Sequence, residues 1–130
     1  MVFKKVFKFG VIGLTCFMLA IIGGVNMVGF AQTEVNFEDN LVGIWQGKLE
    51  VSGISLRIVF NITRDIEGKL TATMDSPDQR VKDIPVEEVV FKDGVLHLEV
   101  KSAGGFFEGK VKEDFLSIEG ELNQAGQSFL

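Results

Sequence analysis

Residues 86–101 read VEEVVFKDGVLHLEVK, and this stretch is the strongest indication of the fold class. Asp93 and Gly94 separate two segments rich in apolar and β-branched residues. An Asp-Gly pair is a strong signal for a two-residue hairpin, because a type I′ turn needs positive φ at both positions. After the turn, every second residue is apolar: Leu96, Leu98 and Val100. The stretch therefore predicts two antiparallel strands with one buried and one solvated face.

The same period of two recurs in the segments on either side of this hairpin. It is found in residues 43–51, 55–65, 69–76, 105–113 and 115–122. Short turn sequences such as Ser52-Gly53 and Glu67-Gly68 separate these segments, and connections this short cannot make parallel crossovers. The pattern predicts an all-β fold, an antiparallel meander of about seven strands with an eighth beginning at Gln127.

A single meander with one apolar face must cover that face, either by curling into a barrel or by folding over as a sandwich. Three glycines are expected on the inward face, at positions 47, 109 and 120, where they suit sharp bends or close backbone approach. They favour a barrel-like, calycin-like domain over residues 41–130, with its last strand truncated. Before it, residues 33–41 are expected to contain at most a short helical turn.

The first 31 residues differ from the rest of the chain. Lys4, Lys5 and Lys8 precede a long apolar run that ends at Ala31. This order is typical of a helical secretory signal peptide, cleaved after Ala31, and it predicts export to the periplasm or the medium. The alternative is an uncleaved membrane anchor, because residues 9–30 are long enough to cross a bilayer. Residues 32–40 form a polar lead-in.

The charge of the chain argues against several classes of partner. The formal net charge is −5, and loss of the three lysines with residues 1–31 moves it to −8. No basic stripe is available to neutralise phosphates, so nucleic-acid binding is not expected. Docking on anionic lipid is disfavoured for the same reason. Any contact with a membrane is expected only through an uncleaved signal segment.

Few residues suggest chemistry. His97 is the only histidine, and Cys16, the only cysteine, lies in the signal segment. Neither a catalytic dyad nor a metal site is expected, and no cofactor is predicted. In the polar loop 73–80, Asp75, Ser76 and Asp78 offer oxygen ligands, but an ordinary turn explains them better. If this loop is functional, a docking or rim role is favoured.

The ordered set of motifs resembles a known family. Residues 41–79 contain Gly-x-Trp-x-Gly, from Gly43 to Gly47, followed by ATMDSPDQ; further on come IPVEEVVFKDGVLHLEV, GGFFEGKV and IEGELNQAGQSFL. This set resembles the N-terminal β-domain of secreted bacterial α/β-hydrolases of the serine esterase or peptidase type. In that family the catalytic serine, acid and histidine lie in a later domain, so the resemblance carries no catalytic residue to this chain.

Two functions are therefore expected as alternatives. The first is a secreted, non-catalytic accessory β-domain, from a truncated or split hydrolase or a stand-alone docking module, with a hydrolase domain as partner. The second is a small apolar-ligand-binding barrel of lipocalin-like shape, because Gly43-Ile44-Trp45 is similar to the Gly-x-Trp of lipocalins. Trp45 either lines the ligand cavity or anchors the core. The candidate binding or docking residues are Trp45, Asp75, Ser76, Asp78 and Gln79.

Overall fold

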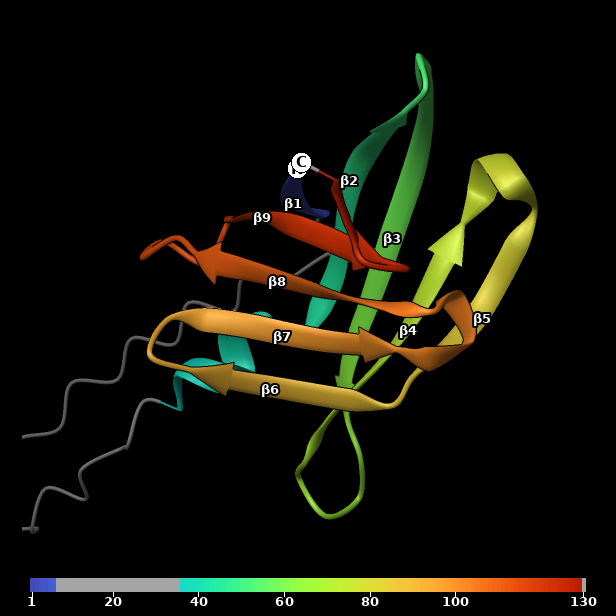
Figure 1. The fold of residues 1–130 in the computed structure, drawn as a ribbon. Helices are drawn as coiled ribbons and strands as arrows, with labels where there is room; N and C mark the ends of the chain where they lie inside the picture. The colour runs from blue at the N-terminus through green and yellow to red at the C-terminus, as the bar shows by residue number, and fades with distance from the viewer. Residues whose placement is uncertain (7–35, 130) are drawn as a thin grey trace, which may run out of the picture.

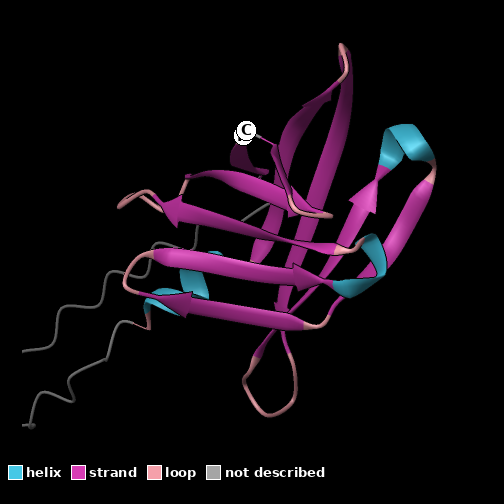
Figure 2. Ribbon diagram, in the orientation of Figure 1, coloured by secondary structure: helices cyan, strands magenta, loops and turns pink. Residues whose placement is uncertain are grey.

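The computed structural model describes residues 1–6 and 36–129, and this part of the chain is all-β. Ten strands and three short 3₁₀ helices make up these residues (Figures 1 and 2). The strands are β1 (Val2–Val6), β2 (Gly43–Val51), β3 (Ile54–Arg64), β4 (Leu70–Ser76), β5 (Val81–Val86), β6 (Glu88–Lys92), β7 (Val95–Val100), β8 (Gly105–Val111), β9 (Ser117–Gln124) and β10 (Gln127–Phe129). The 3₁₀ helices are η1 (Phe37–Leu41), η2 (Pro77–Gln79) and η3 (Lys101–Ala103). Within the described ranges, no helix has the length and apolar character needed to span a bilayer.

The strands form one antiparallel sheet that curls into a nearly closed barrel. The strand order is β5-β4-β3-β2-β1-β9-β8-β7-β6. Strand β10 pairs with the same edge of β9 as β1 does, farther along that strand. In Figure 1, strands β6–β9 cross the direction of β2–β4 steeply, as expected when a twisted sheet folds back over itself. The chain runs from β5 almost directly into β6, and the Glu87 N–H donates to the Glu99 carbonyl at 2.9 Å. This corner brings the two ends of the sheet together.

The hairpin predicted for residues 86–101 is present. Asp93 and Gly94 have φ values of 52° and 78°, the positive angles that a type I′ turn requires. They join β6 to β7, with Lys92 opposite Val95. The turn at Ser52-Gly53 has the same pair of positive angles, 50° and 78°, and joins β2 to β3. The all-β antiparallel prediction is therefore confirmed, in its barrel-like form.

Three phenylalanines from three distant strands meet at the centre of the barrel. The Phe3 ring lies 5.1 Å from that of Phe60 and 4.9 Å from that of Phe107, and the last two lie 5.6 Å apart. All three side chains are fully buried. Aromatic pairs at these distances add directional stabilisation to the large apolar area that they bury. This cluster ties β1, β3 and β8 into one core.

The inward-facing glycines allow close approach, as predicted. A Cβ atom at Gly120 would lie 2.2 Å from the carbonyl oxygen of Glu108, and one at Gly47 would lie 3.0 Å from the Phe3 ring. Neither distance leaves room for a side chain without movement of its neighbour. The sheet can therefore curl tightly at these points.

One end of the barrel is closed by η1, the short helical turn expected before the first long strand. Leu41 is fully buried there, and its carbonyl accepts a 2.8 Å hydrogen bond from Trp45 Nε1. On the other side, Arg64 Nε lies 2.7 Å from the Asp39 carboxylate. These contacts hold η1 across the end of the barrel.

The helical signal segment predicted for residues 1–31 is wrong for its first residues. Residues 2–6 form strand β1, which lies between β2 and β9 and pairs with both. Phe3 points into the core, whereas Val2 and Lys4 are exposed, so this short stretch has the alternation of a strand. The rest of the predicted segment, and residues 32–35 of the polar lead-in, lie in residues 7–35, outside the described residues.

The strand count is higher than predicted because β1 and β5 were not expected. Strand β5 lies at the end of the strand order and contains Pro85, which suits an edge position. It has little of the alternation that marks the other strands, because only Ile84 and Val86 are partly covered. The pairing with β4 also shifts between Met74 and Ser76. A polar, irregular edge strand gives a weak sequence signal.

Candidate functional site

An apolar cavity of about 250 Å³ lies at the end of the barrel opposite η1. Strands from both halves of the sheet contribute to it, together with η2 and η3. Its lining residues are Leu49, Val51, Leu56, Ile58, Met74, Gln79, Ile84, Val100, Ala103, Gly105, Leu122 and Gln124. Most of these are the inward-facing residues of strands whose outward neighbours are polar. The cavity is thus the unfilled end of the barrel core.

Two glutamine amides provide the polar groups of the cavity. Gln79 ends η2, and its Oε1 accepts a 2.8 Å hydrogen bond from Ser76 Oγ. Ser76 is 1% exposed, the one buried polar residue in the described part of the chain. Across the cavity, Gln124 Nε2 donates to the Ala103 carbonyl at 2.6 Å and ties β9 to η3. Both glutamines are exposed, so they lie where the cavity meets solvent.

The two aspartates of loop 73–80 serve the loop itself. The Asp75 carboxylate accepts hydrogen bonds from Asn61 Nδ2 at 3.1 Å and from the Asp83 N–H at 2.8 Å. Asp83 has a φ of 56°, so this bond holds an unfavourable backbone conformation in place. Asp75 thereby supports the irregular pairing of β4 with β5.

Asp78 anchors η2 to β3. Its carboxylate lies 2.8 Å from Arg57 Nη2 and accepts the Arg57 N–H at 2.7 Å. Hydrogen bonds from the Arg57 side chain and then from its backbone lower the pKa of Asp78 to about 2. The turn interpretation therefore accounts for both aspartates. Among residues 1–6 and 36–129, no group of three or more His, Cys, Asp or Glu side chains is placed to hold a metal ion.

Trp45 lies in the core near the closed end, not among the lining residues of the cavity. Of the five residues predicted from the sequence, Gln79 lines the cavity and Ser76 holds Gln79. Asp75 and Asp78 hold the loop from which Gln79 projects. The structure thus places Gln79 at the cavity and Trp45 in the core. That these residues bind a ligand or a partner stays a prediction.

The remaining lining residues were not predicted as site residues. Leu49, Leu56 and Leu122 follow the strand alternation, so their inward direction was readable from the sequence. That alternation does not distinguish a packed end of a barrel from an open one. Ala103 and Gly105 gave a weaker signal, since small residues beside a turn leave space where larger ones would fill it.

His97 lies on the outer face, as expected for its place in the alternation. Its Nδ1 lies 3.2 Å from Glu108 Oε2, and its Nε2 lies 3.5 Å from Glu99 Oε2. The imidazole also stacks on Phe106, with ring centroids 5.0 Å apart. These are cross-strand and same-strand neighbours on a solvated sheet face. The arrangement is that of neighbouring side chains on the outer face of the sheet.

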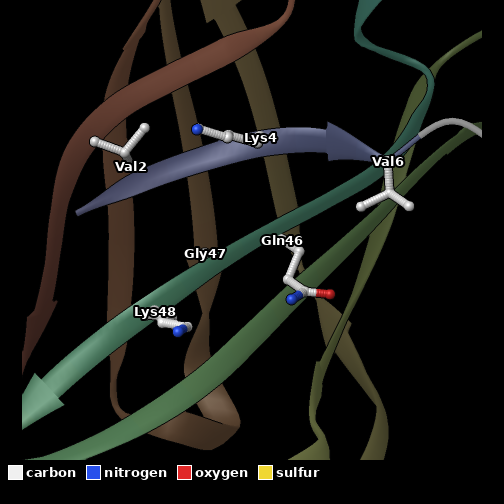
Figure 3. A pocket seen from close by; sticks show the side chains of 6 residues that line it. All are labelled: Val2, Lys4, Val6, Gln46, Gly47 and Lys48. Atoms are coloured by element: carbon white, nitrogen blue, oxygen red, sulfur yellow. The ribbon is translucent and has the colours of Figure 1, made fainter.

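A second, open depression lies on the outer face of β1 and β2. It is lined by Val2, Lys4, Val6, Gln46, Gly47 and Lys48 (Figure 3). The lysine and glutamine side chains are exposed, and among residues 1–6 and 36–129 no buried polar group faces the depression. Exposed lysines on an open surface do not form an enclosed binding site. The interior cavity is therefore the stronger candidate.

Comparison with known proteins finds no matching family model, no matching curated protein and no matching solved structure. The resemblance to the N-terminal domain of α/β-hydrolases stays a prediction. The candidate site accordingly rests on the geometry of the barrel alone.

Proposed function

We propose that this chain is a binding module whose open barrel end takes a short apolar group. The observation that carries the proposal is the 250 Å³ cavity, lined by apolar side chains with two amides at its edge. Ligand sites in proteins commonly combine an apolar lining with a few polar groups that fix orientation. Here the amides of Gln79 and Gln124 offer N–H donors to an oxygen atom at the head of a ligand.

The volume limits the size of the ligand. Sites for drug-sized molecules occupy about 300–1,000 Å³, so this cavity is small. At roughly 30 Å³ for a water-sized group, the cavity holds about eight such groups. A medium-length alkyl chain with an oxygen-bearing head group fits these limits. Octanoate is a suitable probe.

Calorimetric titration of the full chain with butanoate, hexanoate and octanoate tests this function. Each buried methylene contributes about 0.8 kcal/mol, so octanoate is expected to bind up to roughly 200-fold more tightly than butanoate. Ala103→Phe fills the cavity and is expected to abolish the dependence on chain length. Ser102→Phe, at the neighbouring exposed position of η3, is the matched control and should leave it intact. Equal affinity for all three acids, or binding that Ala103→Phe leaves unchanged, would contradict the proposal.

The exposed apolar residues beside the cavity favour docking on a protein as a second candidate. Ile54 is 62% exposed and lies between the lining residues Val51 and Leu56 in the chain. Val81 is 40% exposed and directly follows η2 and its cap. Apolar side chains around an apolar cavity suit a partner that inserts a side chain of its own. This is the accessory role expected from the hydrolase resemblance.

The two candidates respond differently to changes at this rim. Ile54→Asp and Val81→Asp should leave octanoate binding unchanged and weaken docking on a hydrolase domain. The DNA beyond the codon for Leu130 distinguishes the two forms of the accessory role. A serine hydrolase reading frame there supports a truncated or split hydrolase, and unrelated DNA favours an independent docking module.

We also propose export, because residues 1–31 combine a basic start with a long apolar run. N-terminal sequencing of protein recovered from the medium or periplasm tests this. A mature start at Gln32 supports export with cleavage. Protein retained in the cytoplasm contradicts it.

A further inference from the structure

We propose that the slot between β2 and β9 is a binding site for an extended peptide segment. The segment carries a large aromatic residue and, two residues later, a cation. In this structure β1 occupies the slot, with Phe3 and Lys5 as those two residues. The inference is independent of the cavity, which none of the β1 residues lines.

The backbone of β1 is paired along both sides. Lys4 stands opposite Gln46 of β2 and opposite Ser117 of β9. At the start of the strand, the Met1 ammonium donates to the Gly120 carbonyl at 3.0 Å, and the Gly120 N–H donates to the Met1 carbonyl at 2.9 Å. Main-chain pairing of this kind gives affinity for a strand whatever its sequence.

The position that Phe3 occupies explains why the site would prefer an aromatic residue. Its side chain is 1% exposed and contacts the rings of Phe60 and Phe107 at the centre of the barrel. Gly47 lies beside it, and a Cβ at that position would come within 3.0 Å of the Phe3 ring. Gly47 therefore leaves the space that a large ring on the inserted strand fills.

The position that Lys5 occupies explains why the site would prefer a cation. Its ammonium donates to the Asn40 carbonyl at 2.6 Å and lies 5.5 Å from the centroid of the Trp45 ring. At Gly43, a Cβ would lie 2.9 Å from Lys5 Cε. The motif Gly43-x-Trp45-x-Gly47 is thus built around the inserted strand. Gly43 leaves room for the lysine stem, Trp45 attracts its charge, and Gly47 leaves room for the aromatic ring.

The slot lies in line with β10. Both β10 and β1 pair antiparallel with β9, so they run in the same direction along the same edge. Phe129 stands opposite Leu122, Met1 exchanges hydrogen bonds with Gly120, and Val2 stands opposite Glu119. Only the position opposite Glu121 lies between the two strands. A segment that continued directly from β10 would enter the slot in the register that β1 now has.

Removal of residues 1–31 on export, as proposed above, would take β1 out of the slot. The edges of β2 and β9 would then be unpaired, and Trp45 would lose its cover. Unpaired edges beside an apolar gap readily accept another strand. The occupant is then a segment of the same pattern running in the direction of β10.

Moving the strand within the full chain tests this proposal. The starting variant carries Phe3→Asp and Lys5→Ser, which remove both anchors from β1. A copy of MVFKKV is then added directly after Leu130. The matched control has one serine between Leu130 and the copy, because a slip of one residue turns every side chain to the opposite face. Urea unfolding followed by the fluorescence of Trp45 gives the folding equilibrium constant.

The double substitution is expected to lower that constant by about 30-fold or more. The in-register copy should restore most of the loss, and the slipped copy should not. If the starting variant is too unstable to titrate, the recovered fraction of folded protein gives the same comparison, and Phe3→Ala provides a milder background. Equal rescue by both copies, no rescue by either, or no loss in the starting variant overturns the proposal.

Discussion

The ammonium group of Lys5 lies 5.5 Å from the centroid of the Trp45 ring, and it donates a 2.6 Å hydrogen bond to the Asn40 carbonyl. These contacts join β1 to the end of the barrel that η1 closes. Burial lowers the pKa of Lys5, which is partly covered at this position. Trp45 is the only tryptophan in the chain, so its fluorescence reports on this junction.

Lys5→Met is expected to lower the free energy of unfolding by about 1–2 kcal/mol. The substitution removes the hydrogen bond to Asn40 and the cation over the indole ring, while it keeps an apolar stem. Lys4→Met is the matched control, because Lys4 is exposed on the outer face. Urea unfolding measures both. An equal loss in the two variants would show that the Lys5 contacts contribute nothing specific.

Gly120→Ala is expected to destabilise the barrel by about 3 kcal/mol, at the upper end for overpacking. The new Cβ would lie 2.2 Å from the Glu108 carbonyl oxygen and 2.4 Å from the Gly109 Cα, so β8 and β9 must move apart. Gly68→Ala is the comparison. It has open space but a φ of 82°, and about 1 kcal/mol of backbone strain is expected there. Thermal unfolding should rank the two variants in this order, and the reverse ranking would contradict the structure.

The ion pair of Arg57 with Asp78 predicts a specific dependence on pH. The pKa of Asp78 is lowered from 3.8 to about 2 in the folded chain. Its contribution to stability is therefore complete above the unfolded value and is lost as the pH falls through the folded value. The difference in unfolding free energy between the unaltered chain and Asp78→Asn should be constant above about pH 5, shrink as the pH falls, and disappear only below about pH 2.

Urea titrations at a series of pH values measure this difference. Ser102→Ala, which changes an exposed residue of η3 that does not titrate, is the control and should show no comparable change over the same range. A difference for Asp78→Asn that grows as the pH falls would contradict the ion pair.

Ser76→Ala is expected to cost about 1 kcal/mol of stability, because it removes a buried hydrogen bond to Gln79. It should also weaken octanoate binding, since Gln79 loses the contact that fixes it at the edge of the cavity. Ser102→Ala, in exposed η3, should change neither quantity. Calorimetry and urea unfolding on the same samples separate the two effects. Unchanged octanoate affinity in Ser76→Ala would exclude Gln79 from the site.

The alternation of apolar and polar residues was sufficient to predict most of the sheet. Asp93-Gly94 fixed one hairpin, and the inward-facing residues around Leu96 and Phe107 are buried as expected. Strand β5 was not predicted, because its residues are mostly exposed and show little alternation. Strand β1 was not predicted, because its lysines and the apolar run after them are typical of a signal peptide. Its role depends on pairing with β9, more than a hundred residues away in the chain.

The candidate site was less predictable than the fold. The sequence favoured an ordinary turn for loop 73–80, with a docking or rim role if the loop is functional, and Gln79 of this loop lines the cavity. Trp45 is a core residue near the closed end of the barrel. The strand alternation indicated that its side chain points inward, but it did not indicate which end of the barrel is open. Gly43 and Gly47 were notable in the sequence only as part of a motif. These two glycines leave the space that Lys5 and Phe3 need, and this role is evident only when β1 lies beside β2.

The most direct test of the proposed function locates a bound ligand in solution. Nuclear Overhauser contacts between ¹³C-labelled octanoate and the full chain identify the residues that surround its alkyl chain. Contacts to the methyl groups of Met74, Ala103 and Leu122 are expected, because these residues line the cavity. Contacts to Val2 and Val6 on the outer face instead, or no contacts at saturating octanoate, would contradict a binding site inside the barrel.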